Sequence, residues 1–140
     1  GAEYEKKLVS ESGTLSFEKV SLSEGDNTAY AYTATPHDLR SEQSKSYTIV
    51  MDSTKPSVTI DAPKDGEVFR GQSQRITTFS GGVSELGSKV YIGERMVIVQ
   101  SDGKFSLPYQ LVEGDQEIQI KAIDKAGNEG NSSIKLRWEP

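Results

Sequence analysis

The sequence contains no cysteine and a single histidine, and these two absences exclude several kinds of chemistry. Without cysteine there are no disulfides, no thiolate nucleophile and no cysteine-bound metal. One histidine, His37, cannot build a multi-histidine metal site. His37 precedes Asp38, but the sequence has no nucleophile-elbow motif such as G-x-S-x-G to accompany such a pair. We therefore expect the chain not to be an enzyme and to need no cofactor.

Long apolar runs and clusters of basic residues are missing as well. No run approaches the roughly 20 apolar residues that a bilayer requires, so we expect no membrane insertion. The 16 Lys and Arg residues are outnumbered by 21 Asp and Glu residues, which argues against nucleic acid as a partner. The first residues, 1–7, lack the apolar stretch of a signal peptide, and we expect the sequence to be a piece of a longer protein.

An internal repeat is the strongest feature of the sequence. The segment LSEGDN, which starts at Leu22, recurs as LVEGDQ from Leu111, so that Gly25 and Gly114 are 89 residues apart. A glycine-led segment precedes each copy and an alternating segment follows it. This spacing is that of one immunoglobulin-sized sandwich domain. A polar cluster that ends at Pro56 suits a short hinge, which predicts two units, residues 1–55 and 56–140.

Residues 56–140 are predicted to form a complete all-β sandwich. Short alternating runs are separated by glycine-containing turns, and no window shows a helical apolar period. The predicted strands are 57–60, 76–79, 89–92, 96–100, 105–110, 117–123 and 133–138. The residues predicted to face the core are Val58, Ile60, Ile76, Val90, Ile92, Phe105, Leu107, Ile118, Ile120, Ala122 and Leu136.

Residues 1–55 match only the second half of this pattern. At most four strands are predicted, at 3–9, 15–22, 28–35 and 47–51. Half a sandwich leaves one apolar sheet face uncovered. We expect Leu15, Phe17, Val20 and Leu22 to be covered either by a second copy of the chain, as a homodimer through residues 1–55, or by residues 56–140 folding back.

Residues 102–128 carry a family resemblance. The segments DGKFS from Asp102, LVEGDQEI from Leu111 and AIDKAGN from Ala122 resemble the bacterial immunoglobulin-like repeat. Such repeats occur in tandem in secreted and surface proteins, and as accessory domains such as domain B of glucodextranase. Residues 13–55 match more loosely, because TPHDLR from Thr35 replaces the turn DKAGN.

The resemblance implies an immunoglobulin-like β-sandwich preceded by an incomplete immunoglobulin-like unit. It also implies a non-catalytic spacer, adhesion or protein-interaction module of a larger bacterial protein that is secreted or held at the cell surface or cell wall. The other domains of the same chain are then its first partners, and a protein or glycan ligand is a further one. The alternative is a carbohydrate-binding accessory domain of a polysaccharide-active enzyme.

Tyr30, Tyr32 and Tyr47 are candidates for a binding stripe. Aligning the repeats places Ala29 and Ala31 at core positions, and so puts Tyr30 and Tyr32 on the outer face, where Tyr47 is a possible neighbour. A row of aromatic rings on a sheet suits sugar rings or a protein edge. Two alternatives stay open: the tyrosines fill the core in another register, or they are covered in a dimer.

Asp52, Asp61 and Asp124 are weak candidates for calcium ligands. Asp52 and Asp61 flank Pro56, and loop acids such as Asp26 or Asp115 are possible neighbours at the boundary. Calcium prefers carboxylate and carbonyl oxygens but needs several of them together. The competing interpretations are solvated loop acids and, for Asp124, a β-turn in which its carboxylate accepts local N–H bonds. We expect these alternatives rather than a metal.

Overall fold

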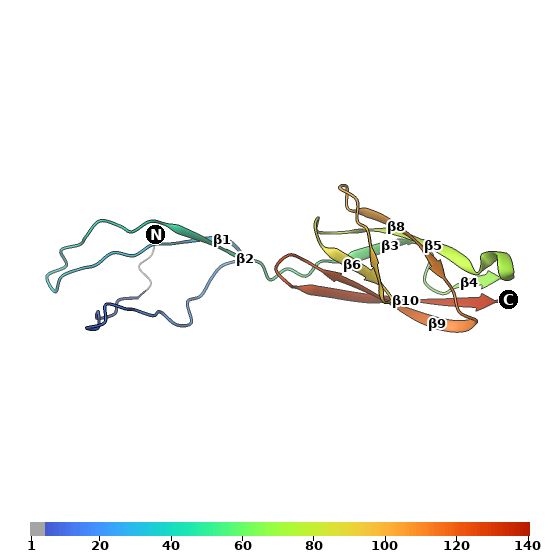
Figure 1. The fold of residues 1–140 in the computed structure, drawn as a ribbon, viewed down its shortest axis with the longest axis horizontal. Coiled ribbons are helices and arrows are strands. Elements are labelled where there is room, and N and C mark those ends of the chain that lie inside the picture. Colours follow the sequence, from blue (N-terminus) through green and yellow to red (C-terminus); the bar gives the residue numbers. More distant parts are fainter. Residues whose placement is uncertain (1–4) are drawn as a thin grey trace. The chain divides into compact units, whose positions relative to one another are not determined.

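The computed structural model describes residues 5–140, and the chain divides into two compact units, Gly1–Asp52 and Ser53–Pro140 (Figure 1). Almost all regular structure in these residues is β, as predicted; a 3₁₀ turn at Gln72–Gln74 is the exception within the described part. None of the described residues forms a helix long and apolar enough to cross a membrane.

The second unit is a sandwich of two sheets. One sheet has five strands in the order β4-β10-β9-β6-β7, and the other has three in the order β3-β5-β8. Neighbouring strands are antiparallel except β4 and β10, which are parallel. The strands are β3 (Val58–Ala62), β4 (Glu67–Arg70), β5 (Ile76–Val83), β6 (Lys89–Ile92), β7 (Arg95–Val97), β8 (Lys104–Gln110), β9 (Gly114–Ile123) and β10 (Glu129–Glu139). The predicted immunoglobulin-like sandwich is confirmed.

The core lies between these sheets and follows the alternation of the strands. In β9 the buried row is Ile118, Ile120 and Ala122, as predicted. The facing sheet contributes Phe79, Phe105 and Leu107. Eight of the eleven residues predicted to face the core are buried, and Val58 is half-buried. Ile60 is half-buried too and packs against the core.

Ile76 is the exception, and it corrects the prediction. It is 63% exposed at the start of β5, where the buried row is instead Phe79 and Gly81. A Cβ at Gly81 would collide with the carbonyl oxygen of Thr59 on β3 and touch the ring of Phe105. Strand β5 therefore turns its row of small and aromatic residues inward, and the alternation then places Ile76 outside.

Two edge strands also differ from the prediction. Strand β4 was not predicted; it pairs with β10, far away in sequence, through the register Glu67↔Leu136. The expected strand 96–100 ends at Val97, and Val99 then forms a bridge to Phe105 on the other sheet. At the point where the chain passes from one sheet to the other, Ile98 is 87% exposed.

The segment that leads into the second unit is part of its packing. Pro56 is fully buried, and a Cβ on Gly130 would collide with its carbonyl group. The next residue, Ser57, accepts a hydrogen bond from the Ser84 backbone N–H at 2.9 Å and donates one to the Ser84 hydroxyl at 2.9 Å. Pro56 is therefore packed as part of the second unit.

Residues 5–52 of the first unit contain one regular sheet, made of β1 (Gly25–Ala29) and β2 (Tyr47–Met51) in antiparallel pairing. The strand predicted at 47–51 is confirmed, whereas residues 15–22 form no strand. Of the strand predicted at 3–9, Glu3 and Tyr4 lie outside the described residues, and residues 5–9 form no strand. The four apolar residues expected to be covered are 37–45% exposed: Leu15, Phe17, Val20 and Leu22.

Candidate functional site

The repeated hexapeptide folds in the same way in both units. Gly25 and Gly114 each have φ of 88°, a conformation that glycine adopts without steric cost. In the first unit the Asn27 side chain accepts from the Ser23 N–H at 2.8 Å and donates to the Ser23 carbonyl at 2.7 Å. Gln116 holds Val112 in the same two-bonded way, at 3.4 and 3.0 Å. An amide side chain thus closes the turn before β1 and before β9.

The strands that follow the two turns are paired alike. Gly25 lies opposite Met51, the last residue of β2, and Gly114 lies opposite Trp138 near the end of β10. Counted from these pairs, Tyr47, Ile49 and Met51 take the places of Ile134, Leu136 and Trp138. The side chains of Ile134, Leu136 and Trp138 are 2–5% exposed, whereas those of Tyr47, Ile49 and Met51 are 37–65% exposed. The row that forms the core of the second unit is therefore open in the first.

This register corrects the expectation for Tyr47. Tyr47 lies directly opposite Ala29, so both side chains leave the same face of the hairpin. Tyr30 follows Ala29, and the alternation of an extended chain directs it to the other face. Tyr47 therefore does not belong to one stripe with Tyr30, and it lies on the open row just described.

Tyr32 lies in a cluster of charged side chains. The guanidinium of Arg40 lies 4.7 Å from the centre of its ring. Asp38 pairs with Arg40 at 3.8 Å and with Lys6 at 3.7 Å. The carboxylate of Asp38 is thus engaged by these cations, and no contact with His37 supports a catalytic pair in the described residues.

The acids considered as calcium ligands have different surroundings. Asp52 is half-buried and ends the first unit, directly after β2. Asp61 is exposed on β3 and pairs with Lys104 at 3.8 Å. Asp115, expected to be a solvated loop acid, pairs with Arg137 at 3.0 Å. Asp61 and Asp115 therefore already have cationic partners.

Asp124 is buried, and it forms the predicted turn. Its carboxylate accepts the Asn128 backbone N–H at 2.9 Å and the Asn128 side-chain amide at 2.8 Å, while Gly127 takes φ of 93°. Burial acts to raise the pKa of Asp124, but the hydrogen bonds from Asn128 and from the backbone of Gly127 and Ala126 outweigh it, so the pKa is lowered. The turn thus holds a charged carboxylate at the end of β9.

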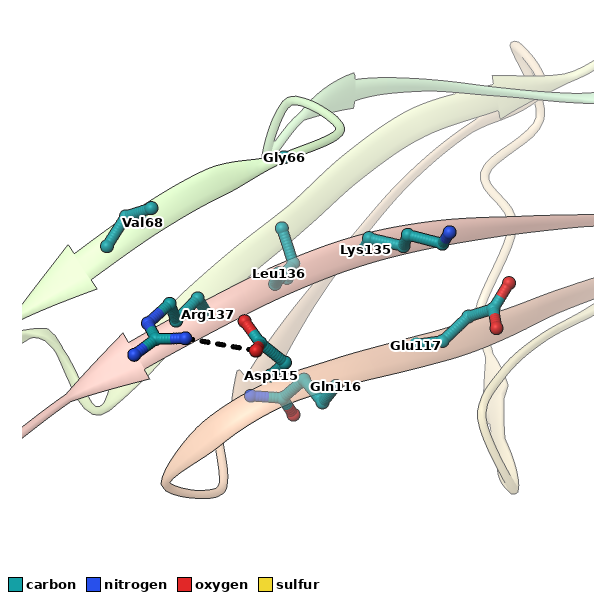
Figure 2. A pocket seen from close by; sticks show the side chains of 8 residues that line it. All are labelled: Gly66, Val68, Asp115, Gln116, Glu117, Lys135, Leu136 and Arg137. Carbon is teal, nitrogen blue, oxygen red and sulfur yellow. Dashed lines mark hydrogen bonds and ion pairs between the residues drawn. The ribbon is translucent and has the colours of Figure 1, made fainter.

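A groove of about 340 Å³ lies on the outer side of the larger sheet, over β4, β9 and β10 (Figure 2). Figure 2 shows Asp115 and Arg137 directed at one another across it, with Val68 and Leu136 nearby. This groove was not predicted, because its lining comes from three strands that are separate in the chain. Asp115 and Arg137 pair with each other there, and Glu117 and Lys135 belong to the same lining.

A comparison with known families decides the identity of the fold. The profile of glucodextranase, domain B, matches residues 56–138. The chain belongs to this family. The matched residues coincide with the sandwich from the buried Pro56 to the core residue Trp138.

Two individual proteins add to this assignment. Bacillopeptidase F of Bacillus subtilis (strain 168) is 35% identical over 109 residues, which are 76% of this chain but 7% of that protein. A solved structure of fibronectin(III)-like modules of Clostridium thermocellum CbhA has a TM-score of 0.50 at 18% identity, covering 84% of this chain and 64% of that one. Both matches are longer than residues 56–140 and therefore extend into the first unit. The chain is thus an immunoglobulin-like domain of the kind found in larger multidomain proteins.

Proposed function

We propose that this chain is a non-catalytic spacer and protein-interaction module of a larger bacterial protein that is secreted or displayed on the cell surface, where it serves in adhesion or in holding other domains apart. Its first unit is the C-terminal part of one immunoglobulin-like repeat, and its second unit is the complete next repeat. The other domains of the same chain are the partners that this arrangement requires.

The repeated turn is the observation that carries this proposal. A glycine at the same φ, the same amide-to-backbone pair of bonds and the same strand pairing recur 89 residues apart. Tandem copies of one sandwich are typical of domains that set distance and orientation. Bacillopeptidase F, which is far longer than the matched segment, supports a place within a larger protein. The resemblance to repeats of secreted and surface proteins supports, by analogy, an extracellular location.

A lack of catalysis is part of the proposal. The groove in Figure 2 contains a neutralised ion pair, and Asp38 binds cations rather than His37. A broad panel of hydrolase substrates should show no turnover above the buffer blank. Reproducible turnover that disappears in His37→Ala or Asp38→Asn would overturn this part of the proposal.

Carbohydrate binding by an accessory domain is the second candidate, and Tyr30 and Tyr32 favour it. Tyr30 is exposed, and the Tyr32 ring carries a guanidinium on its face. The deciding experiment is a glycan pull-down with the full chain, the double variant Tyr30→Ala, Tyr32→Ala and the control Tyr91→Ala in β6. The spacer proposal predicts no retained glycan for any of them. Retention that only the double variant loses would favour the carbohydrate-binding candidate.

A further inference from the structure

Strand β2 has the composition of an inner strand, although it lies at an edge in the described residues. Its sequence, YTIVM, contains neither a charged residue nor a proline, and its pairing with β1 has no bulge. Proteins protect exposed strand edges with charges, prolines or bulges. The four edge strands of the second unit, β3, β4, β7 and β8, each contain a charged residue. The other described strand without charge or proline is β5, the middle strand of its sheet. The composition of β2 therefore suits a strand with a neighbour on both edges.

The free edge of β2 offers the backbone groups of Thr48 and Val50. The carbonyl oxygen of Ile49 accepts a hydrogen bond from the side-chain amide of Asn27 in β1 at 3.3 Å, so Ile49 faces β1. Backbone groups of successive strand residues point to opposite edges, which directs those of Thr48 and Val50 away from β1. Within residues 5–140, β2 pairs with β1 alone. A row of unpaired N–H and C=O groups is a template for a further strand.

The second unit shows what occupies this edge in a complete repeat. In the register given above, Thr48 has the place of Lys135 in β10. The Lys135 N–H donates to the Asp65 carboxylate at 2.8 Å, and the Lys135 carbonyl accepts the Gly66 N–H at 2.7 Å. Directly after this Asp-Gly pair, β4 runs parallel to β10, and Phe69 packs against the core. An Asp-Gly pair followed by a short apolar strand thus closes the edge.

The charges that follow the two strands agree as well. Arg70, the last residue of β4, donates to the carboxylate of Glu139 at 3.1 Å. In the same register Asp52 has the place of Glu139, so a strand of the β4 type brings its cation to an acid there too. Glu139 accepts from Arg137 as well as from Arg70, which shows that an acid at this place can serve more than one partner.

We propose that the free edge of β2 binds a parallel strand that follows an Asp-Gly pair, with an apolar residue opposite Met51 and a basic residue opposite Asp52. The N-terminal part of the same repeat supplies this strand. The inference rests on the proposed function and deepens it, because it names the segment that completes the first unit. The Asp-Gly pair binds the N–H and C=O of Thr48, as its equivalent binds those of Lys135.

Two N-terminal extensions of the full chain test this edge. The longer one is a copy of residues 56–89 placed directly before Gly1, which continues the spacing of 89 residues and adds copies of β3, β4 and β5. The shorter one is a copy of residues 63–72 on a flexible Gly/Ser linker, which raises the local concentration of the strand to about the millimolar range. The shorter extension keeps the test decisive if the longer one fails to fold.

Amide hydrogen exchange, measured residue by residue on monomeric protein, should respond at the free edge. The N–H groups of Thr48 and Val50 should exchange about tenfold or more slowly in an extended chain than in the unextended one. The N–H of Ile49, which faces β1, is the internal reference and should change less. Proton–proton NOEs should connect the copy of Phe69 with Met51, as the parallel register requires.

The matched control carries Val68→Pro and Phe69→Pro within the copied segment, because prolines prevent that segment from pairing as a strand. Slowing in either extended chain that this control loses supports the proposal. No slowing in either chain, equal slowing with the control, or NOEs in an antiparallel register would overturn it. The spacer function is tested separately by turnover and glycan retention, so an edge that stays unpaired leaves those results unchanged, and turnover leaves the exchange at the edge unchanged.

Discussion

Ile120 is fully enclosed by the two sheets, and its truncation measures how much the core depends on one side chain. Ile120→Ala should lower the free energy of unfolding by about 2–5 kcal/mol, because it removes buried methylenes and leaves a cavity. Ile98→Ala is the matched control, since Ile98 is almost fully exposed, and it should cost less than about 0.5 kcal/mol. Urea denaturation measures both. Equal losses in the two variants would contradict the burial of the β9 row.

Gly130 is required for a different reason, because the carbonyl of Pro56 occupies the space of a side chain. Gly130→Ala should destabilise the second unit by about 1–3 kcal/mol, since the backbone of β10 or of the segment at Pro56 must shift. Ser132→Ala, an exposed position on the same strand, should change the unfolding free energy by less than about 0.5 kcal/mol. Thermal melting that is unaffected by Gly130→Ala would show that residues 53–57 are not packed as described.

Single residues also show how far the sequence alone could predict this molecule. The alternation of Ile118, Ile120 and Ala122 predicted a buried row, because burial on one sheet face leaves a period of two in the chain. Ile76 was assigned to the core because apolarity alone does not reveal which row of β5 faces inward. The row is decided by Gly81, whose missing side chain admits the Thr59 carbonyl, a contact between distant residues.

Strand β10 ends in a small network of charges. Glu139 accepts hydrogen bonds from Arg137 at 2.8 Å and from Arg70 at 3.1 Å. The Arg137 hydrogen bond is the largest cause that lowers the pKa of Glu139, with the charges of Arg70 and Arg137 acting in the same direction and burial against it. When a carboxyl group has a lower pKa in the folded than in the unfolded protein, its ionised form stabilises the fold at pH values above the unfolded pKa. This stabilisation is lost as the pH falls through the folded pKa.

Glu139→Gln should therefore lower the melting temperature at neutral pH. This difference in melting temperature should become smaller as the pH falls below about 4, because Glu139 is then protonated as the pH passes its lowered pKa. Thermal melts of the two proteins across this pH range measure the difference. A difference that stays constant with pH would contradict the role of the ionised carboxylate.

Elements differ in how much of their pairing is local. Strands β2, β8 and β9 were predicted because their alternating patterns are continuous in sequence, whereas the strand expected at 28–35 lies earlier, at Gly25–Ala29. Strand β4 was missed because, among the described residues, it pairs with the distant β10 alone. Residues 15–22 were predicted as a strand from their likeness to β8. In the second unit β8 pairs with β5, and residues 5–52 contain no counterpart of β5, so the segment has no partner to pair with.

The open row of the first unit has a consequence for the whole molecule. Apolar faces and strand edges without cover promote association. The full chain should therefore show an average mass that rises with concentration in light scattering, whereas a Ser53–Pro140 truncation should stay monomeric. Ile49→Lys in the full chain, which places a charge on the row, should reduce the association. A monomeric full chain at high concentration would contradict association through this row.

The central claim is that one complete immunoglobulin-like repeat follows the C-terminal part of another. Amide hydrogen exchange of the full chain, kept dilute enough to be monomeric, tests this claim most directly. Amides of β9 and β10 should exchange slowly because both strands are paired within a covered sandwich, while those of β1 and β2 should exchange faster by several orders of magnitude. Equal protection of the two hairpins in the monomer would contradict the claim, because it would show that the first unit is a complete domain by itself.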